Sequence, residues 1–156
     1  MKKINNVNNF IYFAVFLIAL VLTDNYFSTL IVNKLNHGWV MTSPILNMVY
    51  AQNTGAAFNL LNDSNRFLAN FAIIVIFVVF LYLVHNINRT NKKFLFLLSL
   101  FTAGIYGNLY ERLTFGFVRD YFELAFMDFP IFNISDIYIT LAVTGLIITI
   151  LFSRKI

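Results

Sequence analysis

The chain has 156 residues, of which 60% are hydrophobic and only 12% are charged. About 25% of the residues in a soluble globular chain are charged, so this sequence has too little polar surface for a water-soluble domain and fits a lipid bilayer. The absence of Cys excludes disulfides, thiolate metal ligands and a cysteine nucleophile, and the net charge of +4 is spread too thinly between apolar stretches to predict a nucleic-acid partner.

Four long apolar stretches predict four transmembrane helices. Each approaches the roughly 20 residues that cross the hydrocarbon of a bilayer. The first stretch follows Lys2 and Lys3 as in a secretory signal, but no small-x-small cleavage site is present, so we expect it to be retained. With no repeat and no linker, residues 1–156 are expected to form a single integral membrane domain. The expected helices cover approximately residues 8–32, 67–85, 94–114 and 136–153.

The distribution of basic residues predicts that both termini are cytoplasmic. Seven of the 11 Lys and Arg residues lie at the two ends of the chain and in the connection between the second and third helices. Because short cytoplasmic loops carry an excess of Lys and Arg, we place these segments inside. All seven Asp and Glu residues then fall on the outer half, so we expect any chemistry to face outward.

Histidine is a poor candidate for catalysis in this chain. His37 and His85 are the only two, and neither has the i, i+4 partner with an intervening Glu that a zinc protease needs. We interpret both as ordinary loop or interface residues, and we expect no metal ion and no other cofactor. Carboxylates remain as the candidate catalytic groups.

Asp120 and Asp136 both lie near the predicted outer membrane boundary, one after the third apolar stretch and one at the start of the fourth. Each has an ordinary explanation that is as good as a functional one, because Asp136 could cap its helix and Asp120 could pair with Arg119. Two carboxylates within a few ångströms of each other would instead share one proton near neutral pH. The ionised member could then activate water while the protonated member polarises a peptide carbonyl, which is aspartyl-protease chemistry.

The third predicted helix carries a small, a polar and a charged residue on one face, because Gly104, Asn108 and Arg112 are spaced i, i+4 and i+8. Glu111 lies beside them. This seam could present donors to the two acids, although spacing alone favours a packing groove with a snorkelling arginine. The segment 53–58 is rich in small residues that permit a close backbone approach, and it would also be explained as an ordinary turn.

Together these segments resemble the lipoprotein signal peptidases, also called signal peptidase II, over nearly the whole chain. The resemblance rests on the order and spacing of four motifs, each of which would be weak alone. The motifs are Asn53-Thr54-Gly55-Ala56-Ala57-Phe58, Gly107-Asn108-Leu109-Tyr110-Glu111-Arg112, Val118-Arg119-Asp120-Tyr121 and Phe132-Asn133-Ile134-Ser135-Asp136.

The resemblance implies an aspartyl endopeptidase of the bacterial cytoplasmic membrane, which removes the signal peptide from prolipoproteins just before a diacylglyceryl-modified Cys. Asp120 and Asp136 match the catalytic pair of that family. By the same resemblance we assign substrate binding to one set of positions and a supporting role to another. The first set is Asn53, Gly104, Asn108, Arg112 and Asn133, and the second is Asp24, Gly55 and Glu111.

The fold implied is an all-α membrane protein of four transmembrane helices with a small β-rich platform in the first outer loop, near residues 38–58. Alternating apolar residues at 39–41 and 46–50 are compatible with short strands there. The resemblance also implies an amphipathic or flexible stretch at residues 119–130 that covers the acids. The expected partners are diacylglyceryl-prolipoproteins, membrane lipid and globomycin-type inhibitors, with the protein itself a monomer that binds no nucleic acid.

Three positions depart from the family pattern. Ser28 stands where the family usually has Lys, Glu111 where it has Asp, and Ser135 where it has Ala. A catalytically idle homologue that binds lipoproteins is therefore an alternative, against which the retention of both candidate catalytic aspartates argues. A small membrane transporter is a further alternative, but the sequence has neither mid-helix acids nor paired broken helices.

Overall fold

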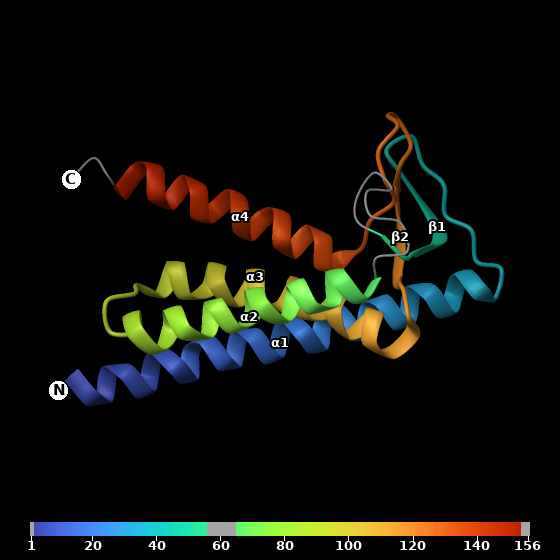
Figure 1. Cartoon of the computed structure of the whole chain (residues 1–156). Coiled ribbons are helices and arrows are strands. Elements are labelled where there is room, and N and C mark those ends of the chain that lie inside the picture. The colour runs from blue at the N-terminus through green and yellow to red at the C-terminus, as the bar shows by residue number, and fades with distance from the viewer. Residues whose placement is uncertain (1, 56–64, 154–156) are drawn as a thin grey trace.

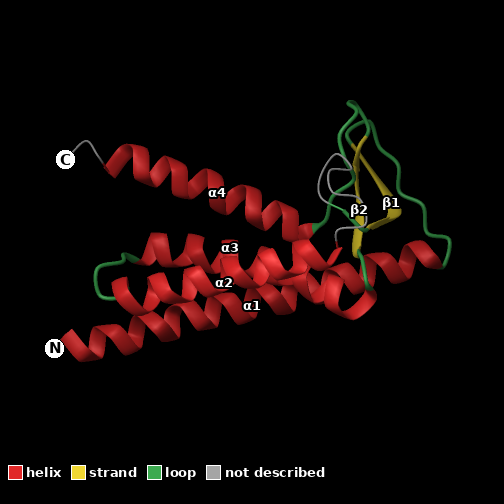
Figure 2. Ribbon diagram, in the orientation of Figure 1, coloured by secondary structure: helices red, strands yellow, loops and turns green. Residues whose placement is uncertain are grey.

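The computed structural model describes residues 2–55 and 65–153, which form four helices and a two-stranded sheet (Figures 1 and 2). The helices are long and apolar enough to cross a membrane, so the expected fold of four spans with a small β platform is confirmed. In chain order the elements are α1 (Lys2–Asn36), β1 (Leu46–Asn53), α2 (Asn65–Asn86), α3 (Lys92–Phe115), β2 (Val118–Leu124) and α4 (Ile134–Ser153).

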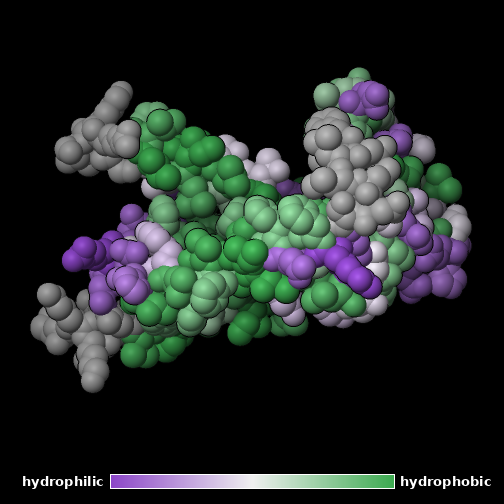
Figure 3. All heavy atoms as spheres, in the orientation of Figure 1, coloured by the Kyte–Doolittle hydropathy of each residue, from purple (hydrophilic) through white to green (hydrophobic). Residues whose placement is uncertain are grey.

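Helix α3 is the centre of the bundle, and the other three helices turn most of their surface outward. Within the most apolar part of each helix, 61% of α3 is buried, whereas the corresponding share in α1, α2 and α4 is 11 to 17%. Small residues on α3, among them Ser99, Ala103 and Gly107, let its neighbours approach closely. The outward faces are covered by hydrophobic side chains, while hydrophilic residues gather mainly at the two ends of the molecule (Figure 3).

The apolar core and the two-stranded sheet lie toward opposite ends of α3 (Figure 1). A buried hydrophobic cluster joins α1, α2 and the first two turns of α3, and the start of α1, the α2–α3 turn and the end of α4 lie at this end of the bundle (Figure 1). The sheet lies at the other end. The cluster consists of Phe13, Val79, Leu83, Ile87, Leu95 and Leu98.

Local capping interactions define both ends of α3. At the start, the side chain of Asn91 accepts a hydrogen bond from the backbone nitrogen of Phe94 at 2.8 Å, as an N-cap does. At the other end, Gly116 adopts a φ of 82°, which favours glycine, and its N–H donates to the carbonyl of Arg112 at 3.1 Å. The chain therefore leaves α3 at Gly116 and enters β2 two residues later.

The sheet joins the first outer loop to the segment between α3 and α4. Strand β1 pairs with β2 in an antiparallel register that places Ala51 opposite Asp120, with an irregularity between Met48 and Ala51. The expectation of an amphipathic or flexible stretch over residues 119–130 is therefore wrong for its first part, which belongs to β2. Its partner strand lies about 70 residues earlier in the chain, so local patterning could not reveal the pairing.

Candidate active site

Asp120 is held in β2 by two side-chain amides. It is only 2% exposed, and its Oδ2 accepts a hydrogen bond from Nδ2 of Asn53 at 2.9 Å. Its Oδ1 accepts from Nδ2 of Asn133, also at 2.9 Å. Since Asn53 ends β1, the pairing of the two strands is what brings this amide beside the carboxylate.

Asp136 lies in the first turn of α4, where it takes part in a reciprocal cap. Its Oδ2 accepts from the backbone nitrogen of Asn133 at 3.1 Å, and its own backbone nitrogen donates to Oδ1 of Asn133 at 3.0 Å. This is the geometry of a capping box, with Asn133 as the N-cap residue and Asp136 three residues later. The second oxygen, Oδ1, accepts from Nδ2 of Asn108 on α3 at 2.8 Å.

Asn133 is the residue that brings the two aspartates together. Its side-chain amide donates to Asp120 and to Oδ1 of Asn108, the latter at 3.0 Å, while its backbone nitrogen donates to Asp136. The side chain is almost completely buried. One asparagine thus contacts both carboxylates and the amide of the third helix.

The charge state of Asp120 is set by its surroundings. Burial and the charge of Asp136 raise the pKa of Asp120 to about 7, although hydrogen bonds from Asn53 and Asn133 and the positive charge of Arg112 act in the opposite direction. An ordinary Asp has a pKa near 4. Asp120 therefore retains a proton at a pH where an exposed carboxyl group has lost it.

Arg112 is tied to backbone carbonyls rather than to a carboxylate. Its Nη1 donates to the carbonyl of Asn108 at 3.2 Å, and its Nη2 donates to the carbonyl of Gly55 at 3.0 Å. Its Nε is buried and has no hydrogen-bond partner among residues 2–55 and 65–153. Gly55 is itself held in place because its N–H donates to Oδ1 of Asn53 at 3.0 Å. The remaining motif residues, 56–58, lie outside the described part of the chain.

Gly104 lies in the contact between α3 and α4. A Cβ atom at this position would come within 2.5 Å of the carbonyl oxygen of Ser135 and 2.7 Å of Cγ1 of Ile139. Only a residue without a side chain allows this approach, so the position serves the close packing of the two helices. Asn108 on the same face donates to Asp136, and the charge of Arg112 acts on both aspartates, although spacing alone favoured a packing groove for this face.

Glu111 forms an ion pair with Arg119. The alternative in which Arg119 pairs with Asp120 is therefore wrong. Nε of Arg119 donates to Oε2 of Glu111 at 2.6 Å, and Nη2 of Arg119 donates to Oε1. The guanidinium also lies over the ring of Phe115, 4.3 Å from its centre. Arg119 is therefore the partner of Glu111 at the end of α3, not of its sequence neighbour Asp120.

Asp24 is hydrogen-bonded to two of the three residues that depart from the family pattern. Oγ of Ser135 donates to Oδ2 of Asp24 at 2.9 Å, and Oγ of Ser28 donates to Oδ1 at 3.4 Å. Tyr121 stands in one of the four motifs, but the sequence patterns give it no role; the residue is completely buried, and its hydroxyl group lies 2.7 Å from Oγ of Ser28. Its place in the motif, directly after Asp120, is the signal that could have found it.

Burial raises the pKa of the Tyr121 phenol, so this side chain is a neutral hydrogen-bonding group at any pH relevant to the protein.

The two histidines do not belong to the candidate active site. His37 contacts the carbonyl of Asn33 after the end of α1, and His85 lies in the last turn of α2. Within the described ranges, no group of three or more Asp, Glu or His side chains has the geometry to hold a metal ion.

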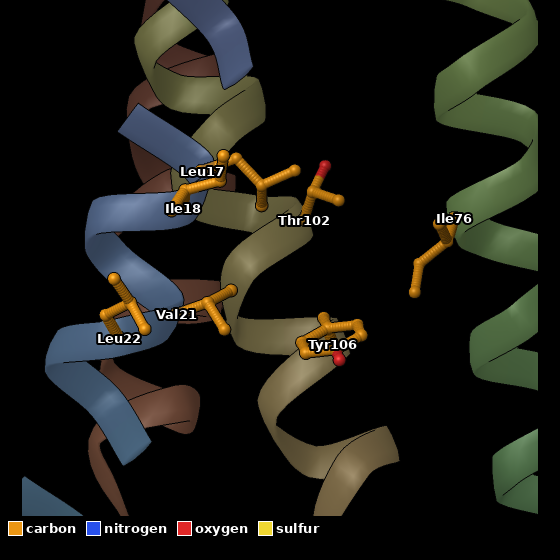
Figure 4. A pocket seen from close by; sticks show the side chains of 7 residues that line it. All are labelled: Leu17, Ile18, Val21, Leu22, Ile76, Thr102 and Tyr106. Carbon is orange, nitrogen blue, oxygen red and sulfur yellow. The ribbon is translucent and has the colours of Figure 1, made fainter. Parts of the chain in front are cut away.

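An apolar groove of about 300 Å³ lies between α1, α2 and α3 (Figure 4). Thr102 and Tyr106 form its wall on α3, two residues out of step with Gly104 and Asn108. Two residues correspond to about 200° around a helix, so the groove lies on the opposite face of α3 from the aspartates. Its remaining lining residues are Leu17, Ile18, Val21, Leu22 and Ile76.

Comparisons with known proteins agree on one family. The family model described as Signal peptidase (SPase) II matches residues 16–152. A lipoprotein signal peptidase of Latilactobacillus sakei subsp. sakei (strain 23K) is 34% identical over 138 residues, covering 81% of this chain and 91% of that protein. One from Streptococcus pyogenes serotype M2 (strain MGAS10270) is 37% identical over 138 residues, covering 87% and 90%.

Two solved structures of bacterial membrane enzymes have a similar fold. A bacterial membrane enzyme determined by the in meso method at 2.3 Å resolution matches with a TM-score of 0.79 and 26% identity, covering 92% of this chain and 89% of that one. A second, determined at 1.9 Å, matches with a TM-score of 0.75 and 27% identity, covering 89% and 92%. With a family match over residues 16–152 and relatives at 34 and 37% identity, the chain belongs to the signal peptidase II family, the lipoprotein signal peptidases.

Proposed function

We propose that this protein is an aspartyl endopeptidase that cleaves diacylglyceryl-modified prolipoproteins just before the lipidated Cys, with Asp120 and Asp136 as its catalytic pair. Its family makes it a membrane protease that processes the signal peptides of prolipoproteins. The observation that supports the aspartyl mechanism best is the double contact of Asn133, whose side-chain N–H donates to Asp120 and whose backbone N–H donates to Asp136.

The proposed pair works with one proton between its two carboxyl groups, as the raised pKa of Asp120 favours. The ionised carboxylate takes a proton from a water molecule, whose oxygen attacks the carbonyl carbon of the scissile peptide bond. At the same time the protonated carboxyl group gives its proton to the carbonyl oxygen, so that a neutral tetrahedral diol forms.

Collapse of the diol completes the reaction. The carboxyl group that took the proton from water now gives it to the peptide nitrogen, and the C–N bond breaks. One hydroxyl group of the diol returns its proton to the other carboxylate. The products are the carboxylic acid at the end of the signal peptide and the free amine of the lipidated Cys, and the pair again holds one proton.

The polar residues around the pair are assigned to holding the peptide backbone. Asn53, Asn108 and Asn133 orient the carboxylates, and their amides line the same site. Nε of Arg112 is free among the described residues to donate to a substrate carbonyl. A globomycin-type inhibitor is expected to bind at this site, between the two aspartates.

The proposed location is the bacterial cytoplasmic membrane, with the aspartates near its outer face. The basic residues Arg89, Lys92 and Lys93 lie at the α2–α3 turn, at the opposite end of the bundle from the sheet (Figure 1). The positive-inside rule places that turn in the cytoplasm. The diacylglyceryl chains of the substrate would then stay in the bilayer beside the outward-facing apolar surfaces of the helices.

The test is cleavage of a purified prolipoprotein by the protein in detergent, with the substrate in diacylglyceryl-modified and unmodified forms. We expect cleavage of the modified form only, followed as a mobility shift, and a new N-terminus at the lipidated Cys. Asp128→Asn, which changes an exposed aspartate in the loop before α4, is the matched control and is expected to cleave normally. Binding of the modified form without cleavage would contradict the proposal and favour an idle homologue.

A further inference from the structure

A buried cluster of three hydroxyl groups around one carboxyl group joins both aspartate-bearing segments to helix α1. The cluster consists of Asp24, Ser28, Tyr121 and Ser135, all of which are buried. Asp24 and Ser28 lie one turn apart on α1, while Tyr121 belongs to β2 and Ser135 to the first turn of α4. The four residues therefore come from three different elements, and two of them are sequence neighbours of Asp120 and Asp136.

The hydrogen bonds of the cluster run in one direction. Ser28 and Ser135 each donate to one oxygen of Asp24. Because a hydroxyl group has a single proton and Ser28 gives its own to Asp24, Tyr121 is the donor in the 2.7 Å contact between Tyr121 and Ser28. The same phenolic oxygen accepts from the backbone nitrogen of Ile134 at 3.3 Å, which ties β2 to the first helical residue of α4.

Two residues of the cluster are direct sequence neighbours of the catalytic pair. Tyr121 directly follows Asp120, and Ser135 directly precedes Asp136. Helix α3 closes the cluster on a further side at Gly107, where a Cβ atom would lie 2.0 Å from Oγ of Ser135 and 2.4 Å from Oδ2 of Asp24. Each aspartate is thus one peptide bond away from a side chain anchored to the same turn of α1.

We propose that Ser28, Tyr121 and Ser135 are positioning residues that set the placement of Asp120 relative to Asp136 through their shared anchor, Asp24. This inference rests on the proposed function. Without the anchor, Asp120 would still be held by Asn53, and Asp136 by Asn108. Backbone hydrogen bonds between Phe122 and Phe132 already join β2 to the segment before α4. What the anchor adds is a side-chain path from Tyr121 through Ser28 and Asp24 to Ser135, which ties both segments to α1 and does not pass through Asn133.

The test begins with Tyr121→Phe, which removes one oxygen atom and with it both hydrogen bonds of that hydroxyl group. We expect kcat to fall about 10- to 100-fold with little change in KM, because misplacing catalytic groups by a fraction of an ångström impairs the chemical step. Tyr26→Phe is the matched control, since Tyr26 lies on α1 with its ring exposed. It is expected to match the wild type.

A second pair of variants separates the hydroxyl group from the shape of the side chain. Ser28→Thr keeps a hydroxyl group, whereas Ser28→Val has the same shape without one. We expect Thr to retain most of the activity and Val to lose it to the same extent as Tyr121→Phe. The double variant Ser28→Val/Tyr121→Phe should be no worse than either single one, because both substitutions break the same link.

Three outcomes would overturn the inference. The first is a Tyr121→Phe variant that turns over substrate like the wild type. The second is equal impairment of Ser28→Thr and Ser28→Val, which would show that only the packing at this position matters. If Tyr121→Phe does not fold in detergent, the Ser28 pair decides alone. A wild-type protein that cleaves no lipidated substrate would overturn the proposed function, and the positioning role with it, whereas wild-type cleavage with unaffected variants overturns the positioning role only.

Discussion

Asn133 combines two tasks that substitutions can separate. It caps α4, and its side chain joins Asp120 to Asn108. Ser is as good an N-cap residue as Asn, but its shorter side chain cannot replace the amide contact with Asp120. We expect Asn133→Ser and Asn133→Ala both to lose most of their peptidase activity and some stability, because both break the buried amide contacts. Asn133→Ala should be about 1 kcal/mol less stable than Asn133→Ser, because it also loses the cap. Activity assays and thermal unfolding of the same preparations check this, and full activity in either variant would contradict it.

The raised pKa of Asp120 predicts how activity and stability depend on pH. Activity, as kcat/KM, should fall as the pH rises through about 7, where the pair loses its shared proton. For stability, the folded state binds this proton more tightly than the unfolded chain. The unfolding free energy should therefore decrease as the pH rises from the ordinary Asp pKa to about 7. Asp120→Asn should remove this part of the pH dependence in thermal unfolding, and an unchanged profile would contradict the assignment.

At the scale of the elements, the Glu111–Arg119 pair fastens β2 to the end of α3. Both side chains are mostly buried, so removing one charge leaves the other without a partner. We expect Glu111→Gln to cost about 3 kcal/mol of unfolding free energy, and the double variant Glu111→Gln/Arg119→Gln to cost less, because no unpaired charge remains. Thermal unfolding in detergent measures both, and a double variant as unstable as the sum of the two single ones would argue against the pair.

The elements also show what the sequence could predict. Stretches with few charges predicted all four helices. Helical spacing placed Asn108 and Arg112 on one face, but it favoured a packing groove there and could not by itself assign that face to the aspartates. The pairing of β1 with β2 could not be predicted, because it depends on residues far apart in the chain. For the same reason the contacts of Tyr121 with Ser28, and of Arg119 with Glu111 across the end of a helix, escaped the sequence patterns.

At the scale of the whole molecule, orientation in the membrane decides where the aspartates act. The chain contains no Cys, so single cysteines can report on the two ends of the bundle without background. Val40 is exposed in the loop before β1, and Asn88 is exposed in the α2–α3 turn. We expect a membrane-impermeant maleimide to label Val40→Cys in intact bacterial cells and Asn88→Cys only after permeabilisation. The reverse pattern would place the aspartates on the cytoplasmic side.

The central claim is that Asp120 and Asp136 act as one catalytic unit, and single-turnover cleavage of a diacylglyceryl-modified prolipoprotein tests it most directly. The rate should be measured for the wild type, Asp120→Asn, Asp136→Asn and the double variant, with Asp128→Asn as the control. Because two residues that act as a unit are not additive, each single variant is expected to be as inactive as the double one, while all still bind the substrate. Substantial cleavage by either single variant would contradict the account.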